Sequence, residues 1–295
     1  MSAFPARTTL ADTYPNPSNA VFRTGIGEFY DATTGLLGTT GNQAEARDLL
    51  GIGGMQQYRL TKSGANLLLS RYGGKFLTVN NVNCAIPAAG VTLAPTGAVS
   101  GTSYFVYATA AAGVVTGLEF SATGYVIDTT SGVPVKSSDP TRTLVGLVRA
   151  VGGPAWSDIA AQRFVISWAN RRPIRCFATS ASAVNIATSA PTPIIPFMEF
   201  LTWGDSCVSA QLAATVTNTT ANALTFTGLA LDSNTTISMP ALVFQAYAGT
   251  ASGYAAGGKV FELAEGYHYI YTLGYVSGGT GTWSAGLEHN AVIQG

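Results

Sequence analysis

Alternation of apolar and polar side chains is the clearest pattern in the last third of the chain. Between residues 208 and 217 the even positions carry Val, Ala, Leu, Ala and Val, whereas the odd positions carry Ser, Gln, Ala, Thr and Thr. Because successive side chains of a strand point to opposite faces, this pattern predicts a strand with its even face buried. Residues 267–275 alternate similarly and place four tyrosines and a leucine on one face. We expect that tyrosine face to pack in a sandwich core or a subunit interface.

Runs rich in Val, Ile, Tyr, Phe and Thr, separated by Gly, Asn, Pro and Ser clusters, extend the β pattern back to about residue 56. Such runs predict short strands joined by turns. The expected strands are 75–80, 103–109, 114–120, 125–129, 143–151 and 163–170. The segment 156–162 is expected to form a short helical turn. Because no repeat of fixed period is present, we predict an all-β fold with two β-sandwich or jelly-roll-like domains rather than a solenoid or propeller.

Residues 1–55 have a different composition and predict an extended N-terminal arm. Three prolines interrupt the first 17 residues, and one short helix is expected at 43–50. Asn42 can cap that helix, Glu45 can complete a capping box, and Gly51 can end it. A segment of this kind buries little surface by itself, so we interpret it as an attachment region that lies against a partner.

Composition divides the remainder of the chain into three parts. A first β-sandwich domain is expected over 56–177, and a C-terminal jelly-roll-like domain is expected over 197–295. Between them, residues 178–196 are rich in Ala, Ser and Thr and hold three prolines in quick succession. That composition is typical of a linker or an extended entry strand.

The charge balance excludes two classes of binding partner, nucleic acids and anionic membranes. The 295 residues include 15 basic and 15 acidic ones, so the formal net charge is zero, and only 10% of residues are charged. An average soluble domain has about 25%. Neutrality removes the electrostatic basis for binding nucleic acid or anionic membranes, and a hydrophobic fraction of 47% argues against disorder. Chains with so little charge tend to associate, which is a first indication of an assembled protein.

Neither a signal peptide nor a transmembrane segment is expected. The first residues lack a basic region followed by an apolar one, and the uncharged stretch 76–118 is interrupted by Asn, Pro and Gly. Synthesis in a reducing cytoplasm is therefore expected. Cys84, Cys176 and Cys207 are widely spaced, and we expect them to be buried, reduced thiols.

Two short motifs are similar to catalytic or nucleotide-binding elements, and each is incomplete. Residues 253–259 match the first seven positions of a P-loop, but Val260 stands where the magnesium-binding hydroxyl belongs. Residues 204–207 are similar to the neighbourhood of a nucleophilic serine, which requires a histidine and a third group. His268, expected at the surface, and His289 are the two histidines of the chain. We therefore favour a strand connection and a turn over chemistry at these motifs.

The acidic and basic residues also give no support for a catalytic site. Four aspartates fall near turns, where aspartate usually caps local backbone: Asp128, Asp139, Asp158 and Asp232. A glycosidase would need two carboxylates facing each other, an arrangement that a sequence does not reveal. The basic cluster at 171–175 is expected to be a solvated domain junction or to pair with a partner's carboxylates. We predict a non-enzymatic protein without a cofactor or metal.

Several segments carry a resemblance to a known class of proteins. Residues 8–19 read Thr-Thr-Leu-Ala-Asp-Thr-Tyr-Pro-Asn-Pro-Ser-Asn, and residues 44–52 read Ala-Glu-Ala-Arg-Asp-Leu-Leu-Gly-Ile. Together with Tyr30-Asp31 and the Gly-Leu-Leu-Gly at 35–38, this region resembles the virion-attachment region of tailed-bacteriophage tail fibres. Residues 144–149 and 164–172 are similar to a β domain of phage appendage and head-associated proteins. Residues 265–269, 278–283 and 293–295 are similar to C-terminal jelly-roll-like domains of phage fibre proteins.

The resemblance implies a homotrimeric virion component, assembled in the cytoplasm of a host bacterium and docked through its N-terminal arm. The expected partners are further copies of the chain, other virion proteins of a tail or capsid ring, and host surface glycans, with no nucleic acid and no membrane insertion. The residues expected to attach the arm to the particle are Tyr14, Pro15, Pro17, Phe22, Phe29, Tyr30, Leu36, Leu37, Leu49 and Leu50.

A short tail fibre or appendage subunit is the preferred interpretation, because the chain has no coiled-coil or β-helical shaft. A capsid decoration or head-fibre protein is the first alternative. A glycan-binding or glycan-cleaving receptor module is the second.

Overall fold

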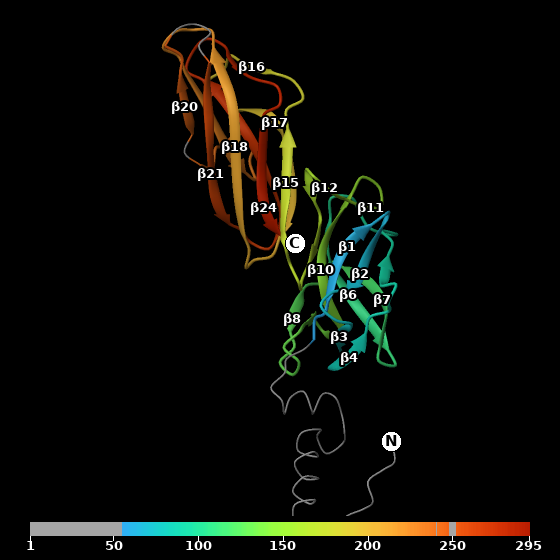
Figure 1. Ribbon diagram of the computed structural model, residues 1–295. Coiled ribbons are helices and arrows are strands. Elements are labelled where there is room, and N and C mark those ends of the chain that lie inside the picture. The colour runs from blue at the N-terminus through green and yellow to red at the C-terminus, as the bar shows by residue number, and fades with distance from the viewer. Residues whose placement is uncertain (1–54, 240, 248–251) are drawn as a thin grey trace, which may run out of the picture.

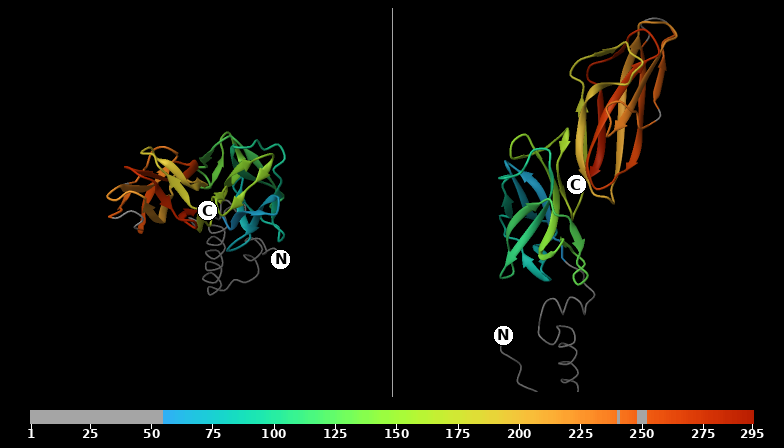
Figure 2. Two further views of the ribbon diagram at one scale, coloured as in Figure 1. Left: turned by 90° about the horizontal axis from the view of Figure 1, so that it is seen from above. Right: turned by 180° about the vertical axis from the view of Figure 1, so that it is seen from behind.

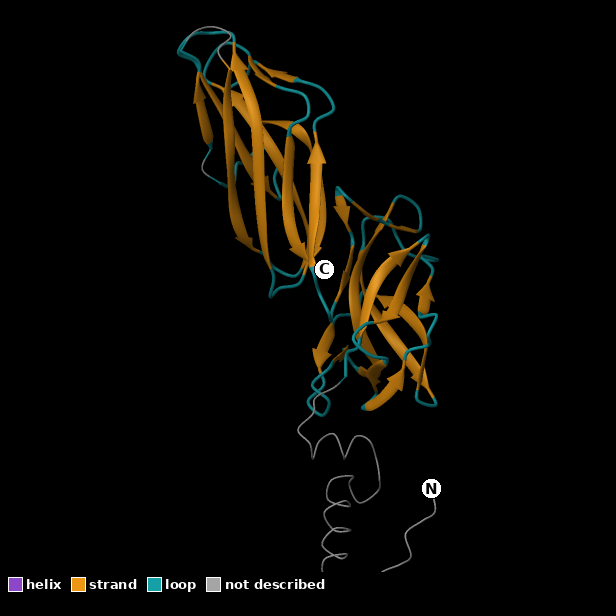
Figure 3. Cartoon of the chain, in the orientation of Figure 1, coloured by secondary structure: helices purple, strands orange, loops and turns teal. Residues whose placement is uncertain are grey.

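The computed structural model describes residues 55–239, 241–247 and 252–295. These residues form strands and turns arranged as two lobes that lie end to end (Figures 1 and 3). The all-β prediction is confirmed for this part of the chain. The predicted helix at 43–50 and every predicted attachment residue lie outside the described residues. No helix in the described part has the length and apolarity needed to cross a membrane.

The N-terminal lobe consists of a small sheet and a large sheet. The small sheet has the order β1-β2-β5, with β1 (Tyr58–Ser63), β2 (Asn66–Arg71) and β5 (Val91–Leu93). The large sheet has the order β3-β4-β7-β6-β10-β9-β8, and β11 and β14 also pair with β10. Its strands are β3 (Phe76–Val79), β4 (Val82–Ala85), β6 (Ser103–Ala111), β7 (Val114–Ser121), β8 (Tyr125–Ile127), β9 (Pro134–Lys136), β10 (Asp139–Val151), β11 (Ala155–Trp156) and β14 (Val165–Ser167). Leu60, Leu69 and Val106 are buried in the core that these strands share.

The C-terminal lobe consists of two six-stranded sheets. One has the order β12-β13-β17-β22-β19-β20, and the other has the order β15-β24-β18-β23-β16 with β21 paired to the free side of β18. The strands of the first are β12 (Asp158–Ile159), β13 (Gln162–Arg163), β17 (Thr192–Thr202), β22 (Gly266–Val276), β19 (Leu224–Leu231) and β20 (Leu242–Gln245). Those of the second are β15 (Pro173–Thr179), β24 (Glu288–Gln294), β18 (Cys207–Asn218), β23 (Gly281–Trp283), β16 (Val184–Ile186) and β21 (Ser252–Glu262).

The two alternating patterns of the sequence have different outcomes. In β18 the even residues from Val208 to Asn218 are all buried, as the alternation predicts. In β22 the buried core face carries Ile270 and Val276, whereas Tyr269 and Tyr271 lie partly exposed on the outer face of the sheet. Tyr269 and Tyr271 are therefore not part of the sandwich core, and the alternative that this face packs in a subunit interface stays a prediction. Period-two spacing identifies two faces but does not say which one is covered.

The segment 156–162 is not a helical turn, because its residues take part in β11, β12 and β13. Strand β13 pairs in parallel with β17, with Gln162 opposite Glu199. Pairing with β17, which is distant in sequence, overrides the local helical preference of this segment.

The chain enters the C-terminal lobe earlier than residue 197. All of β15 pairs with β24, from Pro173 opposite Gln294 to Thr179 opposite Glu288. The segment 178–196, expected to be a linker or an entry strand, holds the end of β15, all of β16 and the first part of β17. Its prolines are compatible with strands because Pro193 and Pro196 lie beside irregularities in the pairing of β17 with β22.

Candidate functional site

A cluster of aromatic rings joins the two lobes. The Trp168 ring packs edge-on against Trp203, with centroids 4.9 Å apart, and Tyr125 packs 5.1 Å from Trp168. Trp203 is 1% exposed, and its indole nitrogen donates a 3.0 Å hydrogen bond to the carbonyl oxygen of Ser167. Trp203 follows β17 in the C-terminal lobe, whereas Ser167 ends β14 in the N-terminal lobe. The junction is thus a packed interior and not a flexible hinge.

Charged groups surround this aromatic cluster. The guanidinium of Arg171 lies 5.1 Å from the ring centre of Trp168 and forms an ion pair with Asp205. The Tyr125 hydroxyl donates a 2.8 Å hydrogen bond to Glu265. Burial, reinforced by the Glu265 carboxylate, raises the pKa of Tyr125 to about 12. Burial also raises the pKa of Glu265, and this effect outweighs the opposing influence of Tyr125 and Arg171.

A second set of contacts lies at the start of β22. Arg149 of β10 stacks on the Tyr267 ring at 3.7 Å, and Phe164 packs 6.0 Å from the same ring. The Tyr267 hydroxyl donates to Glu199, whose other carboxylate oxygen accepts a 2.8 Å hydrogen bond from Gln162. These contacts continue the hydrophobic core of the C-terminal lobe into the N-terminal one.

The last residue of the chain also lies at the junction (Figure 1). Gly295 and Arg172 exchange two backbone hydrogen bonds, of 2.7 and 3.0 Å. Since β15 begins at Pro173, the last entry of the chain into the C-terminal lobe and its exit from that lobe lie at the same place. The basic cluster at 171–175 is therefore part of a domain junction, as expected, although Arg171 is largely covered.

Two surfaces of the C-terminal lobe carry exposed aromatic or polar groups. The first is an aromatic cluster of Phe197, Tyr269 and Tyr271 on the outer face of the β17–β22 pair. The Phe197 and Tyr271 rings lie 4.9 Å apart, the Tyr269 and Tyr271 rings lie 5.8 Å apart, and Phe197 is 38% exposed. Nearness to Tyr269, after burial, contributes to a raised pKa of Tyr271.

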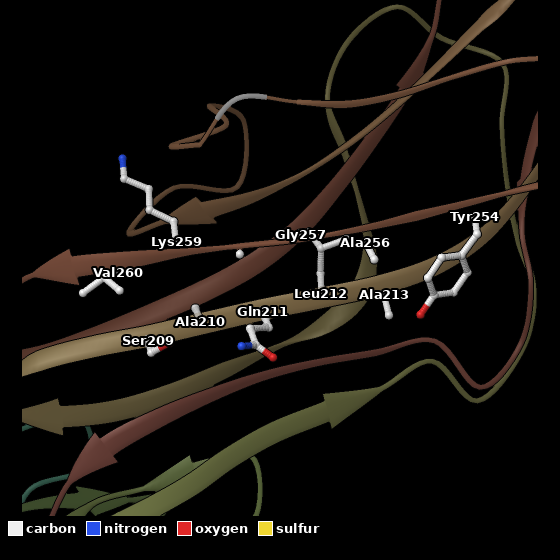
Figure 4. Close-up of a pocket in the computed structure, with 11 residues that line it drawn as sticks. Ser209, Ala210, Gln211, Leu212, Ala213, Tyr254, Ala256, Gly257, Lys259 and Val260 are labelled. Carbon is white, nitrogen blue, oxygen red and sulfur yellow. The ribbon is translucent and has the colours of Figure 1, made fainter.

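The second surface is a shallow hollow of about 630 Å³ over β18 and β21 (Figure 4). Small residues such as Ser209, Ala213 and Gly258 line its floor, and Tyr254 and Val260 flank it. The incomplete P-loop at 253–259 is part of this surface. It lies within the extended strand β21, so its backbone does not form the loop before a helix that cradles phosphate.

The serine and histidine motifs do not form a catalytic group. The Ser206 hydroxyl donates to the Asp205 carboxylate at 3.4 Å. Both ring nitrogens of His268 are engaged, one with Asp232 at 2.8 Å and the other with the carbonyl of Ala264 at 3.0 Å. The His268 side chain is 12% exposed, so the expected surface histidine is mostly covered.

His289 lies inside the C-terminal sandwich. It is fully buried, and its Nδ1 atom lies 2.8 Å from the Thr272 hydroxyl of the opposite sheet. Burial lowers the pKa of His289 to about 4, although the backbone of Pro196 opposes the shift. The neutral form of His289 therefore bridges the two sheets.

Of the four aspartates expected to cap local backbone, Asp128 and Asp139 do so, whereas Asp158 pairs with Arg163 and Asp232 accepts a hydrogen bond from the distant backbone of Tyr269. Asp128 accepts hydrogen bonds from the backbone and hydroxyl of Ser131, and Asp139 accepts them from Thr141. The Ser131 hydroxyl is the main reason that the pKa of Asp128 is lowered. Within residues 55–239, 241–247 and 252–295, no group of three or more His, Cys, Asp or Glu residues is placed to hold a metal ion.

The cysteines only partly follow expectation. Cys84 and Cys176 are buried, but Cys207 is exposed. Cys207 is the first residue of β18 and points to the same side as the other odd positions of that strand. The prediction of a buried thiol is therefore wrong for Cys207, and the alternation of β18 gives the reason.

Comparisons with known proteins identify no family. No protein-family model matches the chain, and no curated protein matches its sequence. Among solved structures, it is similar to Eiger TNF from S. frugiperda, with 10% identity and a TM-score of 0.31, over 41% of this chain and 92% of that one. It is similar to the infectious bursal disease virus Gt strain structure, with 13% identity and a TM-score of 0.31, over 80% of this chain and 68% of that one.

A family 35 carbohydrate binding module from Clostridium thermocellum is a third similar structure. It has 16% identity and a TM-score of 0.20, over 42% of this chain and 97% of that one. All three TM-scores are far below the level of a shared fold, so the functional conclusions below rest on the residues of this chain alone.

Proposed function

We propose that this protein is a non-enzymatic structural component of a tailed-phage virion, a subunit of a trimeric short tail fibre or appendage. In this role residues 1–55 dock on the particle, and the β-sandwich domain and the C-terminal jelly-roll-like domain project from it. The observation that carries the proposal is the packed junction around Trp203. It makes one continuous elongated body of two sandwiches, as a projecting appendage requires.

The direction of the chain through this body supports the same role. The described chain begins at Met55, whose backbone bonds to Thr78 of β3. Strand β3 lies at the end of the N-terminal lobe farthest from the C-terminal lobe (Figures 1 and 2). The attachment region therefore connects at one end of the body, and the C-terminal sandwich forms the other.

The low charge of the chain supports assembly with other copies. Ion pairs are few within the described residues. Those of Arg163 with Asp158 and of Arg175 with Glu288 join neighbouring strands, and that of Arg171 with Asp205 lies at the junction of the two lobes. Faces with little charge pack together without burying unpaired ions. A homotrimer is the assembly proposed here.

Virion assembly without residues 1–55 tests the proposal. A truncated chain that starts at residue 56 is expected to remain folded and trimeric by sedimentation but to be missing from purified particles. The full-length chain with the same internal epitope is the matched control, and antibody labelling of particles carrying it should mark the tail. Labelling of the capsid would instead assign a decoration or head-fibre role. Normal incorporation of the truncated chain would refute docking through the arm.

A further inference from the structure

The hollow over β18 and β21 is built from the outward residues of two paired strands. Register places Thr215 opposite Tyr254, Ala213 opposite Ala256, and Ser209 opposite Val260. At about 3.3 Å per residue, Tyr254 and Val260 stand roughly 20 Å apart along β21. The residues between them on this face are small, so the floor is lower than its two ends.

Glycine at position 258 is needed for this shape. Gly258 lies opposite Gln211, and a Cβ atom there would lie 2.6 Å from the carbonyl oxygen of Ala210 and 3.0 Å from Cγ of Gln211. A larger residue would press against the backbone of β18 and displace the Gln211 side chain. The open floor and the position of Gln211 therefore depend on the same glycine.

The hollow offers an aromatic face and neutral hydrogen-bonding groups. Tyr254 is 69% exposed. Within the described residues, the side chains of Gln211 and Ser209 have no hydrogen-bond partner. An amide and a hydroxyl that remain free can each donate and accept hydrogen bonds. Exposed polar groups of this kind are available to a ligand without breaking any contact in the protein.

None of the residues that line the hollow places a cation on its open side, and Arg175, which lies on the same face of the sheet beyond β24, is paired with Glu288. Lys259 borders the hollow, but Lys259 extends to the opposite side of the sheet from Gln211 (Figure 4). Its ammonium group donates to the carbonyl of Ser238 at 2.7 Å and lies 5.2 Å from the Phe261 ring. The ligand chemistry that fits is therefore neutral.

A sugar ring has the complementary chemistry. Its hydroxyl groups pair with an amide and a hydroxyl, and its C–H face stacks on the electron-rich face of an aromatic ring. The volume of about 630 Å³ lies within the range of small-ligand sites, about 300–1,000 Å³. We propose that this hollow binds a neutral oligosaccharide, with Tyr254 stacking on one sugar ring and Gln211 and Ser209 hydrogen bonding to its hydroxyls. This inference holds for the isolated protein and does not depend on a place in a virion.

Saturation-transfer NMR on the purified full-length chain tests the site. The probes are neutral hexasaccharides built from glucose, galactose, mannose or N-acetylglucosamine. At least one is expected to receive saturation. Tyr254→Ala should weaken its binding about threefold to tenfold, the worth of one aromatic contact, and Gln211→Ala should weaken it by a similar factor. Both side chains are exposed, so both variants should keep the thermal midpoint of the wild type.

Tyr247→Ala is the matched control, because Tyr247 is an 81% exposed tyrosine of the same lobe that does not line the hollow. It should bind as the wild type does. Tyr271→Ala reports on the aromatic cluster of the opposite sheet. Binding that is lost in Tyr271→Ala but kept in Tyr254→Ala would overturn the proposal, as would no saturation of any probe. A Tyr254→Ala protein that changes its sedimentation coefficient without affecting sugar binding would assign this face to contact between copies and would also overturn it.

Discussion

The indole nitrogen of Trp203 donates a hydrogen bond to the carbonyl oxygen of Ser167, 3.0 Å away and across the boundary between the two lobes. Both residues are buried. The hydrogen bond is embedded in an aromatic cluster whose surroundings include residues of both sandwiches. We therefore expect the two lobes to unfold as one cooperative unit.

Trp203→Ala tests that coupling. Removing a buried tryptophan should lower the free energy of unfolding by about 3–5 kcal/mol and separate thermal unfolding into two calorimetric transitions. Trp203→Phe keeps a ring but loses the hydrogen bond, so it should cost about 1–3 kcal/mol and retain one transition. A single, unshifted transition in Trp203→Ala would show that the lobes are coupled elsewhere.

Gly146→Ala should destabilise the N-terminal lobe. A Cβ atom at this position of β10 would lie 2.4 Å from the Leu60 side chain and 2.6 Å from the backbone oxygen of Ile166. Overpacking of this kind costs about 1–3 kcal/mol. Gly152→Ala is the control, since a Cβ atom there meets nothing within 4 Å, and urea unfolding should change by less than about 0.5 kcal/mol. Equal midpoints for the two variants would contradict the close packing around β10.

Acid should weaken the C-terminal sandwich through His289. Its pKa is about 4 in the folded chain and about 6.5 when unfolded. The stability that neutral His289 contributes is therefore complete above pH 6.5 and is lost as the pH falls toward 4, because only the unfolded chain takes up a proton in that window. At pH 5 the loss should be about 2 kcal/mol relative to pH 7.5.

Urea unfolding of the wild type and His289→Gln at both pH values measures this effect. Carboxyl groups with raised pKa values, such as Glu265, stabilise the folded chain as the pH falls, and they do so equally in the wild type and in His289→Gln. The difference between the proteins isolates His289. Equal losses in the two proteins between pH 7.5 and pH 5 would exclude the histidine as the cause.

Cys207 should be the cysteine that reacts in the folded chain. Iodoacetamide at neutral pH is expected to add one label per chain by mass spectrometry, because Cys84 and Cys176 are buried. Burial raises the pKa of Cys176 to about 12, which further suppresses its reactive thiolate. Cys207→Ser should take up no label until urea is added. Labelling at Cys176 in the native protein would indicate local opening of β15.

The sequence predicts a strand well where apolar and polar residues alternate within that strand. The alternation of β18 gives both the strand and its buried face, because Val208 to Val216 offer only one apolar side. In β22 the tyrosines and Leu273 make one face the more aromatic, whereas the other face mixes Ile270 and Val276 with His268, Thr272 and Gly274. The pattern alone therefore does not identify the core face. The short strands β12 and β13 were not predictable for a different reason. They form because β17 and β15 provide backbone partners from elsewhere in the chain.

The candidate sugar site depends on register and could not be predicted. Gly258 and Gln211 are 47 residues apart in the numbering, and they become neighbours because β21 aligns with β18 over eleven residues. The same glycine-rich segment read alone is similar to a phosphate loop. In the structure the segment is an extended strand, because its backbone pairs with β18.

The paired backbone bonds of Arg172 and Gly295 have a practical consequence for locating this chain in any larger particle. A fluorescent or gold marker fused after Gly295 would report the waist of the body and not its far tip. To mark the tip, an insertion belongs in the turn between β18 and β19, at the other end of the C-terminal lobe. The separation between the two markers would then give the direction in which the body points.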